Sequence, residues 1–586
     1  MPVAGTRNMH HPIRAFIFFL AVAASIAGTL SFITGTPRAR LNVQQIIWLL
    51  FIFALAALLA SRRREAVVTS GSNHPIGTVF QTDANLKKWI WIGLALILGF
   101  SVYWSALDLG FLSDDFAHVR YARGPASSRL WSELTEGQAK TFFRPLGFAT
   151  LFLDYRLWSE WPEGYHLSNL MLHLISVAGV FLLCGCLGLS WREAGIGASV
   201  FAVLPVQVEA VGWIAARFDL MATVLMVWAM VLYASFRRRR RAGFYFGSLL
   251  CFLAALLSKE CAFIFPFVVA LYEWLGFGSH SIEGIAVFAR QDSVQTKESN
   301  LRIAPEYRQG KRSSANRQKG TGVIPVAGFA VVALIVFLYR WKILGGIGGY
   351  PASTGGPATL DIGWRTAFAL LVRAPAQMLF ACNWQQPAGI GIVLITSVTA
   401  GILLLLPLVT EPSVLHKRVM LLGIGWIFLT LLPAHPLLMI GSGLTNSRIL
   451  YPGSIGMALL LAALVGALPN ARQQIIVTPA LLFALCSGTF HNLQAWQWTN
   501  AALNNTIAKL PQICGVIPRN AEIQTIGFPA TLRGIHFFAP ELRGEILKFA
   551  LRREDIKVKQ DAVGNAGVVL KWVNADPPRV ECEPLR

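Results

Sequence analysis

The chain contains few charged residues for its length. Only 14% of its 586 residues are Asp, Glu, Lys or Arg, and 54% are hydrophobic, whereas about a quarter of a typical soluble protein is charged. Apolar runs of roughly 18 to 22 residues, long enough to cross a bilayer, account for the difference. The scarcity of charge therefore excludes a soluble globular protein and indicates a polytopic membrane protein.

Several motifs that bind cofactors or nucleotides are also missing. We find neither a P-loop nor a dinucleotide fingerprint, which argues against a nucleotide-binding site of either kind. No His, Asp and Glu cluster has a decisive metal-ligand spacing, so a divalent metal ion is left open as a cofactor. Most of the eight cysteines lie in or beside apolar runs. Cys514 and Cys582 lie in the polar tail and could form a disulfide if the tail faces an oxidising compartment.

Positive charge is abundant, but its distribution is typical of a membrane protein. The formal net charge is +21, and basic runs at Arg62–Arg64 and Arg237–Arg241 directly follow apolar runs. Such runs mark cytoplasmic loops by the positive-inside rule. They have no folded nucleic-acid-binding module around them, so we expect no nucleic acid partner.

Hydropathy and flanking charge predict an all-α polytopic fold with about 13 transmembrane helices. The spans are expected near Ile13–Thr34, Val43–Ala60, Trp89–Leu107, Tyr165–Leu187, Glu193–Val211, Leu220–Phe236, Gly243–Leu257, Phe263–Leu275, Val323–Tyr339, Ile390–Leu408, Val419–Pro433, Ile449–Leu468 and Ile475–Ser487. This divides the chain into an N-terminal hairpin and cytoplasmic loop (1–88) and a membrane body (89–490) that contains a basic cytoplasmic linker (276–322).

The remaining residues, 491–586, form a polar tail. An odd number of spans places this tail on the extracytoplasmic side. Its strand-like segments, Ile523–Phe528, Ile556–Lys559 and Val568–Val573, and a helix over Pro540–Arg552 predict a small α/β domain there.

Two adjacent acids, Asp114 and Asp115, follow the outward-running span Trp89–Leu107. Side-by-side carboxylates beside a bilayer are costly unless they hold a proton, a metal or a substrate. Because neighbours on a helix point about 100° apart, only one of the two is expected to touch a substrate. The pair indicates an enzyme that works at the extracytoplasmic surface of the membrane.

Further polar residues recur at helix ends on the same predicted side. They are Arg144, His166, Glu209, Arg217, Asp219, Lys259, Glu260, Arg448 and Tyr451. A group of positively and negatively charged side chains around one cavity would bind a charged ligand. Arginine in particular suits bidentate contact with phosphate. In the alternative interpretation each pair is local, with Arg217 beside Asp219 and Lys259 beside Glu260, and His166 is a hydrogen-bonded structural residue.

These motifs resemble those of the type C (GT-C) membrane glycosyltransferases. The resemblance is strongest to the protein O-mannosyltransferase branch that includes the TMTC proteins and their bacterial relatives. The motifs that carry it are Asp114-Asp115, Arg144-Pro145-Leu146, Tyr165-His166-Leu167 with Asn169 and His173, Pro205 with Glu209, Trp213, Arg217 and Asp219, Ser258-Lys259-Glu260, and Arg448 with Tyr451, Ser454 and Gly456. The chain departs from the family pattern at Leu204, Gln207 and Ser447.

The resemblance implies transfer of a sugar from a polyprenyl-phosphate donor to a hydroxyl of a protein, lipid or glycan on the periplasmic face of an inner membrane. Asp114 is the expected base, and Asp115 would position it or bind a divalent ion. Arg448 and Lys259 are expected to bind the donor phosphate, and Glu209, Arg217 and Asp219 to shape the sugar pocket. Arg144, His166, Glu260 and Tyr451 are further substrate-binding candidates. The alternatives are a transporter or lipid flippase, or an assembly protein whose outer domain binds a partner.

Overall fold

The computed structural model describes ten segments of the chain. They are residues 77–137, 141–279, 323–349, 363–379, 381–387, 390–437, 441–514, 517–560, 568–573 and 579–584. The predicted N-terminal hairpin and residues 280–322 of the predicted linker lie outside these segments.

Long apolar helices dominate the described residues. Six stretches are long and apolar enough to cross a membrane: Leu86–Asp108, Pro162–Cys186, Ile214–Arg239, Pro325–Leu344, Val414–Ala434 and Ala471–Gln512. A pair bent by 45°, Trp191–Ala202 with Pro205–Gly212, raises the number to seven if it is one span. The chain is therefore a multi-pass membrane protein, as predicted, but the expected number of about 13 spans is not confirmed by the described part.

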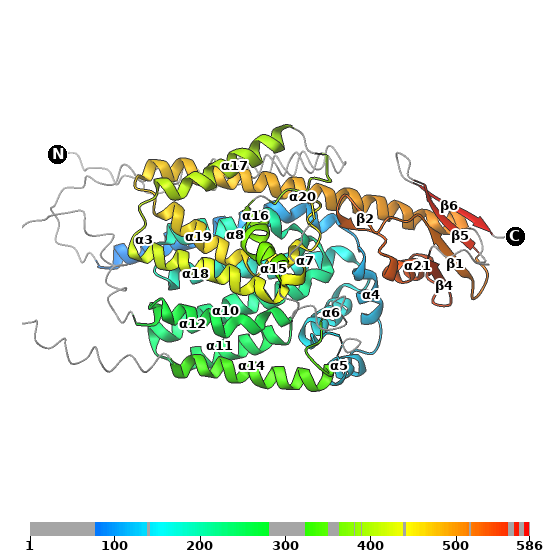
Figure 1. The fold of residues 1–586 in the computed structure, drawn as a ribbon, viewed down its shortest axis with the longest axis horizontal. Helices are drawn as coiled ribbons and strands as arrows, with labels where there is room; N and C mark the ends of the chain where they lie inside the picture. The colour runs from blue at the N-terminus through cyan, green and yellow to red at the C-terminus, as the bar shows by residue number, and fades with distance from the viewer. Residues whose placement is uncertain are drawn as a thin grey trace, which may run out of the picture.

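The helices of the bundle are α3 (Gly77–Tyr103), α7 (Pro162–Cys186), α8 (Trp191–Ala202), α9 (Val208–Gly212), α10 (Arg217–Arg239), α11 (Ala242–Leu256), α12 (Phe265–Trp274), α14 (Val323–Leu344), α17 (Ile390–Val409), α18 (Val414–Leu431), α19 (Ser454–Gly466) and α20 (Ala471–Cys514). The short helices α15 (Trp364–Phe368) and α16 (Ala374–Leu379) accompany them. Figure 1 shows most of these helices running side by side along the long axis of the molecule.

Local sequence explains where several helices begin and end. Helix α8 starts with a capping box between Ser190 and Glu193, and proline at 205 stands where the chain bends before α9. Helix α10 ends in Arg237–Arg239, where positive side chains are favourable beside the helix C-terminus. This end of the bundle, which carries the basic run, is called the basic end below.

The opposite end of the bundle carries three short helices, α4 (Asp114–Ala122), α5 (Ala126–Thr135) and α6 (Pro145–Trp158). Figure 1 shows them at the end of the bundle that is nearer to the C-terminal domain. Helix α14 reaches the same region, and it exposes the apolar side chains Val331, Leu334, Ile335 and Leu338. Such a surface is typical of a helix that faces lipid.

The C-terminal domain (517–560, 568–573 and 579–584) is small and mixed α/β, as predicted. Its sheet has the order β4-β1-β5-β6. The three predicted strands appear as β1 (Glu522–Ile526), β4 (Lys557–Gln560) and β5 (Val568–Val573), which pair in parallel, and β6 (Arg579–Pro584) runs antiparallel to β5.

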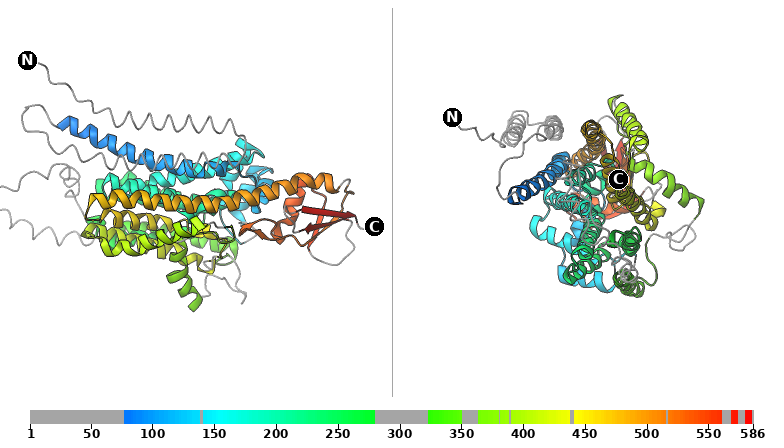
Figure 2. Two further views of the ribbon diagram at one scale, coloured as in Figure 1. Left: turned by 90° about the horizontal axis from the view of Figure 1, so that it is seen from above. Right: turned by 90° about the vertical axis from the view of Figure 1, so that its left-hand side faces the viewer.

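Two more elements of the C-terminal domain approach the membrane body. The predicted helix is present as α21 (Arg543–Leu551), and a two-stranded hairpin is formed by β2 (Thr531–Leu532) and β3 (Ile535–His536). Helix α20 continues without a break past position 490, where we expected the membrane body to end, and leads into this domain (Figure 2).

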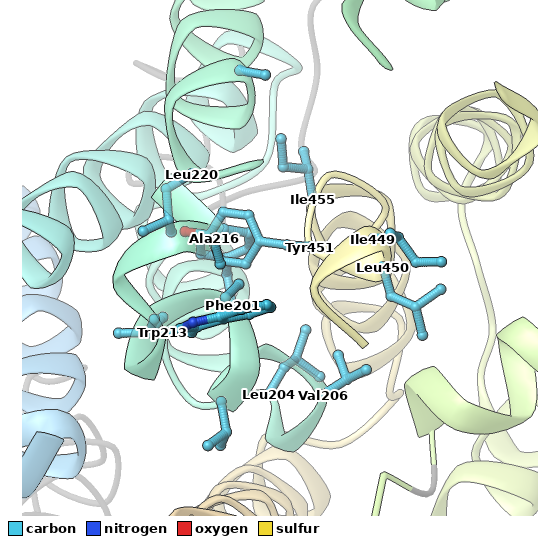
Figure 3. Close-up of a cluster of buried hydrophobic side chains, with 14 of the residues drawn as sticks. Phe201, Leu204, Val206, Trp213, Ala216, Leu220, Ile449, Leu450, Tyr451 and Ile455 are labelled. Atoms are coloured by element: carbon cyan, nitrogen blue, oxygen red, sulfur yellow. The ribbon is translucent and has the colours of Figure 1, made fainter. Parts of the chain in front are cut away.

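A continuous apolar core holds the bent α8–α9 segment, the start of α10 and the segment before α19 together. Figure 3 shows Tyr451 lying beside Ala216 and Leu220, with Phe201 nearby. The rings of Phe201 and Tyr451 meet edge to face with centroids 5.6 Å apart. This core fixes the helix ends that carry the polar residues described next.

Candidate active site

A cavity of about 670 Å³ lies at the end of the bundle opposite the basic end. Six of the eleven residues predicted for the site line it, from five separate stretches of chain: Asp114, Arg144, Asp219, Lys259, Glu260 and Arg448. The other five do not line it: Asp115, His166, Glu209, Arg217 and Tyr451. Distant polar residues therefore converge on one cavity, although the cavity contains only part of the predicted set.

The two adjacent acids have different surroundings. Asp114 begins α4 and lines the cavity. Asp115 is fully buried, and its carboxylate accepts hydrogen bonds from the backbone N–H of Leu112 (2.9 Å) and of Ala215 (2.8 Å). Burial raises the pKa of Asp115 well above its usual range, while the two amides act in the opposite direction. Asp115 thus ties the start of α4 to the segment before α10, and only Asp114 faces the cavity.

One face of α4 supplies more of the cavity wall. Asp114, His118 and Tyr121 all line the cavity, and their spacing of four and three residues places them on one side of a helix. Burial lowers the pKa of His118, although the nearby Asp114 acts to raise it. Our sequence prediction did not include His118 or Tyr121, and this spacing is the signal that could have found them.

The first group of lining charges surrounds Asp219. Lys259 Nζ donates to Asp219 Oδ2 at 2.5 Å, and Arg448 Nε lies 3.9 Å from the same oxygen. Arg448 is fixed by Glu209, which accepts from Arg448 Nη1 (2.8 Å) and from its backbone N–H (2.8 Å). The Arg448 guanidinium also lies over the Trp213 ring, 4.9 Å from its centroid. Glu209 therefore acts on the cavity through Arg448.

The second group of lining charges surrounds Glu260. Arg144 Nε donates to Glu260 Oε2 at 3.1 Å, and Arg340 Nη1 lies 3.7 Å from that oxygen. Burial would raise the pKa of Glu260, but the guanidinium of Arg144 and the nearby Lys259 and Arg340 hold it well below its usual range. Sequence reasoning missed Arg340, because a basic residue at the end of an apolar span is typical of simple snorkelling.

The ion pairs are not the local ones considered in the alternative interpretation. Lys259 pairs with Asp219, and Arg217 pairs with Asp154 of α6. The local pairing of Arg217 with Asp219 and of Lys259 with Glu260 is therefore wrong. The observed pairs join segments that are far apart in sequence and close the wall of the cavity.

Arg217 lies behind this wall and is almost completely buried. Besides its ion pair with Asp154, it donates to Asn169 Oδ1 (2.8 Å) and to the Tyr165 carbonyl (3.0 Å). Asp154 also accepts from Ser168 Oγ at 2.9 Å. We expected Arg217 to shape the sugar pocket, but its side chain does not line the cavity and instead connects α6, α7 and α10.

His166 and Tyr451 are also buried away from the cavity. His166 Nε2 lies 3.4 Å from the Gly110 carbonyl oxygen, and Tyr451 Oη lies 2.9 Å from His173 Nδ1. The surroundings of His166 match the alternative interpretation, in which it is a hydrogen-bonded structural residue. Tyr451 belongs to the core shown in Figure 3.

The C-terminal domain contacts the helix that carries Asp114. Arg120 of α4 forms ion pairs with Glu545 and Glu554, and the rings of Phe116 and Phe549 meet edge to face with centroids 5.1 Å apart. Leu542 lines the cavity itself. This domain therefore supports the cavity wall as well as covering the end of the bundle.

The described residues do not form a metal site of the usual kind. No group of three or more His, Cys, Asp or Glu side chains within them could hold a metal ion. Asp115, which we had considered as a metal ligand, uses both carboxylate oxygens on backbone amides. The donor set thus does not fit a divalent ion held by protein side chains alone.

No family model matches the chain. Curated relatives include the protein O-mannosyl-transferase Tmtc1 of Drosophila melanogaster, 32% identical over 175 residues that cover 28% of this chain and 20% of that protein. Another is the human protein O-mannosyl-transferase TMTC4, 24% identical over 420 residues that cover 63% of this chain and 53% of that protein. The chain spans about a fifth to a half of the length of these relatives.

Among solved structures, ArnT from Cupriavidus metallidurans bound to undecaprenyl phosphate aligns with 83% of this chain and 94% of that chain. The TM-score is 0.42 and the sequence identity is 11%. The sequence relatives confirm the resemblance that the motifs predict. The chain is therefore a membrane protein that is similar in sequence to the TMTC protein O-mannosyl-transferases.

Proposed function

We propose that the chain is a membrane glycosyltransferase that moves a sugar from a polyprenyl-phosphate donor to a hydroxyl acceptor on the extracytoplasmic side. The observation that carries the proposal is the cavity, in which the Asp114 carboxylate shares one space with Arg144, Lys259, Arg340 and Arg448. Asp114 forms no ion pair with another described residue. A base and several cations in one cavity are what transfer from a phosphate leaving group requires.

In the proposed reaction, the acceptor oxygen attacks the anomeric carbon of the donor sugar. The bond between that carbon and the phosphate oxygen breaks, and its electron pair stays with the departing polyprenyl phosphate. The proton of the acceptor hydroxyl passes to the Asp114 carboxylate. No step uses a metal ion.

The departing phosphate would bind at Lys259 and Arg448. Arg448 is held by Glu209 and lies over Trp213, so its guanidinium is fixed before the ligand binds. A preorganised cation stabilises developing negative charge more effectively than one that must first reorient. Asp219 lies between Lys259 and Arg448 and would balance their charge before a phosphate binds.

The lipid part of the donor would leave the cavity beside α14. Phe263, Phe337, Pro433, Ala434 and Ile449 give this part of the cavity an apolar lining. Helix α14 carries Phe337 and exposes apolar side chains outward. A polyprenyl chain could therefore pass from the charged site into the bilayer without crossing polar surface.

The side of the membrane is inferred from the charge of α10. This helix carries Asp219 at the cavity and Arg237–Arg239 at its other end. The positive-inside rule places the arginines in the cytoplasm and the cavity outside. We accordingly propose a cell inner membrane, with the site facing the periplasm.

The base assignment is tested by Asp114→Asn, which keeps the shape of the side chain but removes its ability to take a proton. We expect transfer from undecaprenyl-phosphate mannose to fall by about a hundredfold or more, while the affinity for undecaprenyl phosphate stays unchanged. Asp108→Asn is the matched control, since Asp108 is exposed and does not line the cavity. Full activity of Asp114→Asn would remove Asp114 from the base role.

A further inference from the structure

Glu133 of α5 is an unusual member of the cavity lining. Its side chain is only 4% exposed and nevertheless faces the cavity. Tyr121 Oη donates to Glu133 Oε1 at 2.9 Å. The other oxygen, Oε2, is buried and has no hydrogen-bond partner among the described residues.

Two other acids that line the cavity have a cationic partner, and Glu133 differs from them. Asp219 is paired with Lys259, and Glu260 with Arg144. No ion pair within the described part of the chain includes Glu133, and burial raises the pKa of its carboxyl group, although the Tyr121 hydrogen bond acts in the opposite direction. A buried acceptor without a donor is unfavourable and rare in folded proteins. A ligand that donates a hydrogen bond would satisfy it.

The position of Glu133 indicates which part of a ligand would reach it. Tyr121 and Asp114 lie on the same face of α4, seven residues apart, which is about 10 Å along a helix. His118 lies between them, and its Nδ1 is also buried without a partner in the described residues. Beginning at the proposed base, the wall thus presents a row of hydrogen-bonding groups that ends at the pair of Tyr121 and Glu133.

We propose that Glu133 and Tyr121 form a sugar-binding subsite, in which Glu133 Oε2 accepts a hydrogen bond from a hydroxyl group of the donor sugar. The inference rests on the proposed function, because it takes Asp114 as the centre of the reaction. A sugar ring carries several hydroxyl donors, whereas the polyprenyl chain carries none and the phosphate is largely deprotonated at neutral pH. Glu133 would therefore distinguish a sugar-loaded lipid from the bare lipid phosphate.

The test compares the wild-type chain with Glu133→Gln, both purified in full and placed in lipid nanodiscs. Glutamine keeps the side-chain volume and one oxygen for Tyr121, but it replaces the second oxygen with an N–H donor. The probes are undecaprenyl phosphate and undecaprenyl-phosphate mannose. We expect Glu133→Gln to bind the mannose-loaded lipid about tenfold more weakly, the loss of one hydrogen bond to a charged or polar acceptor, and to bind the bare lipid phosphate as the wild type does.

Glu136→Gln is the matched control. Glu136 lies three residues further on, is exposed and accepts from Ser132 Oγ at 3.1 Å outside the cavity. The Glu136→Gln variant should bind both the mannose-loaded lipid and the bare lipid phosphate as the wild type does.

Three results would overturn the inference. The first is equal binding of the mannose-loaded lipid by Glu133→Gln and the wild type. The second is an equal loss of affinity for both lipids, which would give Glu133 a role in the shape of the cavity only. The third is a wild-type chain that binds the loaded and the bare lipid equally well. Failure of the wild type to bind either lipid would instead contradict the proposed function itself.

Discussion

Replacing Arg217 by methionine should strongly destabilise the protein. Its guanidinium is 1% exposed, pairs with Asp154, and donates to Asn169 and to the Tyr165 carbonyl. Methionine has a similar length but cannot pair, so it leaves the Asp154 carboxylate buried without a cation. Breaking a buried ion pair in this way costs about 3–5 kcal/mol.

The loss can be measured from thermal denaturation midpoints of the purified protein in detergent. Arg156→Met is the matched control, because Arg156 is an exposed arginine in the same helix as Asp154, and an exposed substitution should change stability by only about 0.5 kcal/mol. The double variant Arg217→Met with Asp154→Asn should be more stable than Arg217→Met alone, since no buried charge is then left unpaired.

The refuting result is also specific. If Arg217→Met were as stable as Arg156→Met but bound undecaprenyl-phosphate mannose more weakly, Arg217 would contact the substrate. The expectation drawn from the sequence would then be right and the buried arrangement wrong.

Two other predictions concern the cavity wall. Because Arg144 holds the pKa of Glu260 below its usual value, the pair stabilises the fold above the unfolded pKa of about 4.3, and this stability is lost as the pH falls below it. Glu260→Gln should flatten that acid dependence in thermal denaturation scans, and an unchanged slope would contradict the pairing. His536→Ala should remove the ring that lies 5.1 Å from Trp213 and so loosen the support of Arg448. Steady-state kinetics should show a KM for the lipid donor raised several-fold with a smaller change in kcat, and an unaltered KM would exclude this support.

Helix geometry explains which parts of the site were predictable. Apolar spans determine where the polar residues emerge, so the grouping of Asp219, Lys259 and Arg448 at one end of the bundle followed from the sequence. Of the two adjacent acids only Asp114 lines the cavity, as expected for neighbours on a helix, and its contact with a substrate stays a prediction.

The same geometry explains the errors. Arg217 and Asp219 are two residues apart on α10, so their side chains point about 200° apart and cannot share one face. Asp219 turns to the cavity, and Arg217 turns to Asp154, whose contribution depends on tertiary packing that no local pattern encodes. Glu133 was missed for a similar reason, because an acid on a short polar helix normally faces water.

The fold was predicted at the level of its class. The strands and the helix of the C-terminal domain were found because alternating β-branched residues have a short, distinct period. The number of spans was harder to predict, because α11, α12 and α19 are apolar but only 10 to 15 residues long. Apolar runs of this length fill the interior of a bundle as readily as they cross a bilayer.

Consumption of a lipid-linked sugar by the purified chain tests the central proposal most directly. The full protein, in nanodiscs without any ion or voltage gradient, would be supplied with radiolabelled undecaprenyl-phosphate mannose and a mixture of hydroxyl acceptors. We predict loss of mannose from the lipid, release of undecaprenyl phosphate, and neither change with Asp114→Asn. An intact donor under these conditions, with movement of the lipid only when the protein spans a sealed vesicle, would contradict a transferase and favour a transporter or flippase.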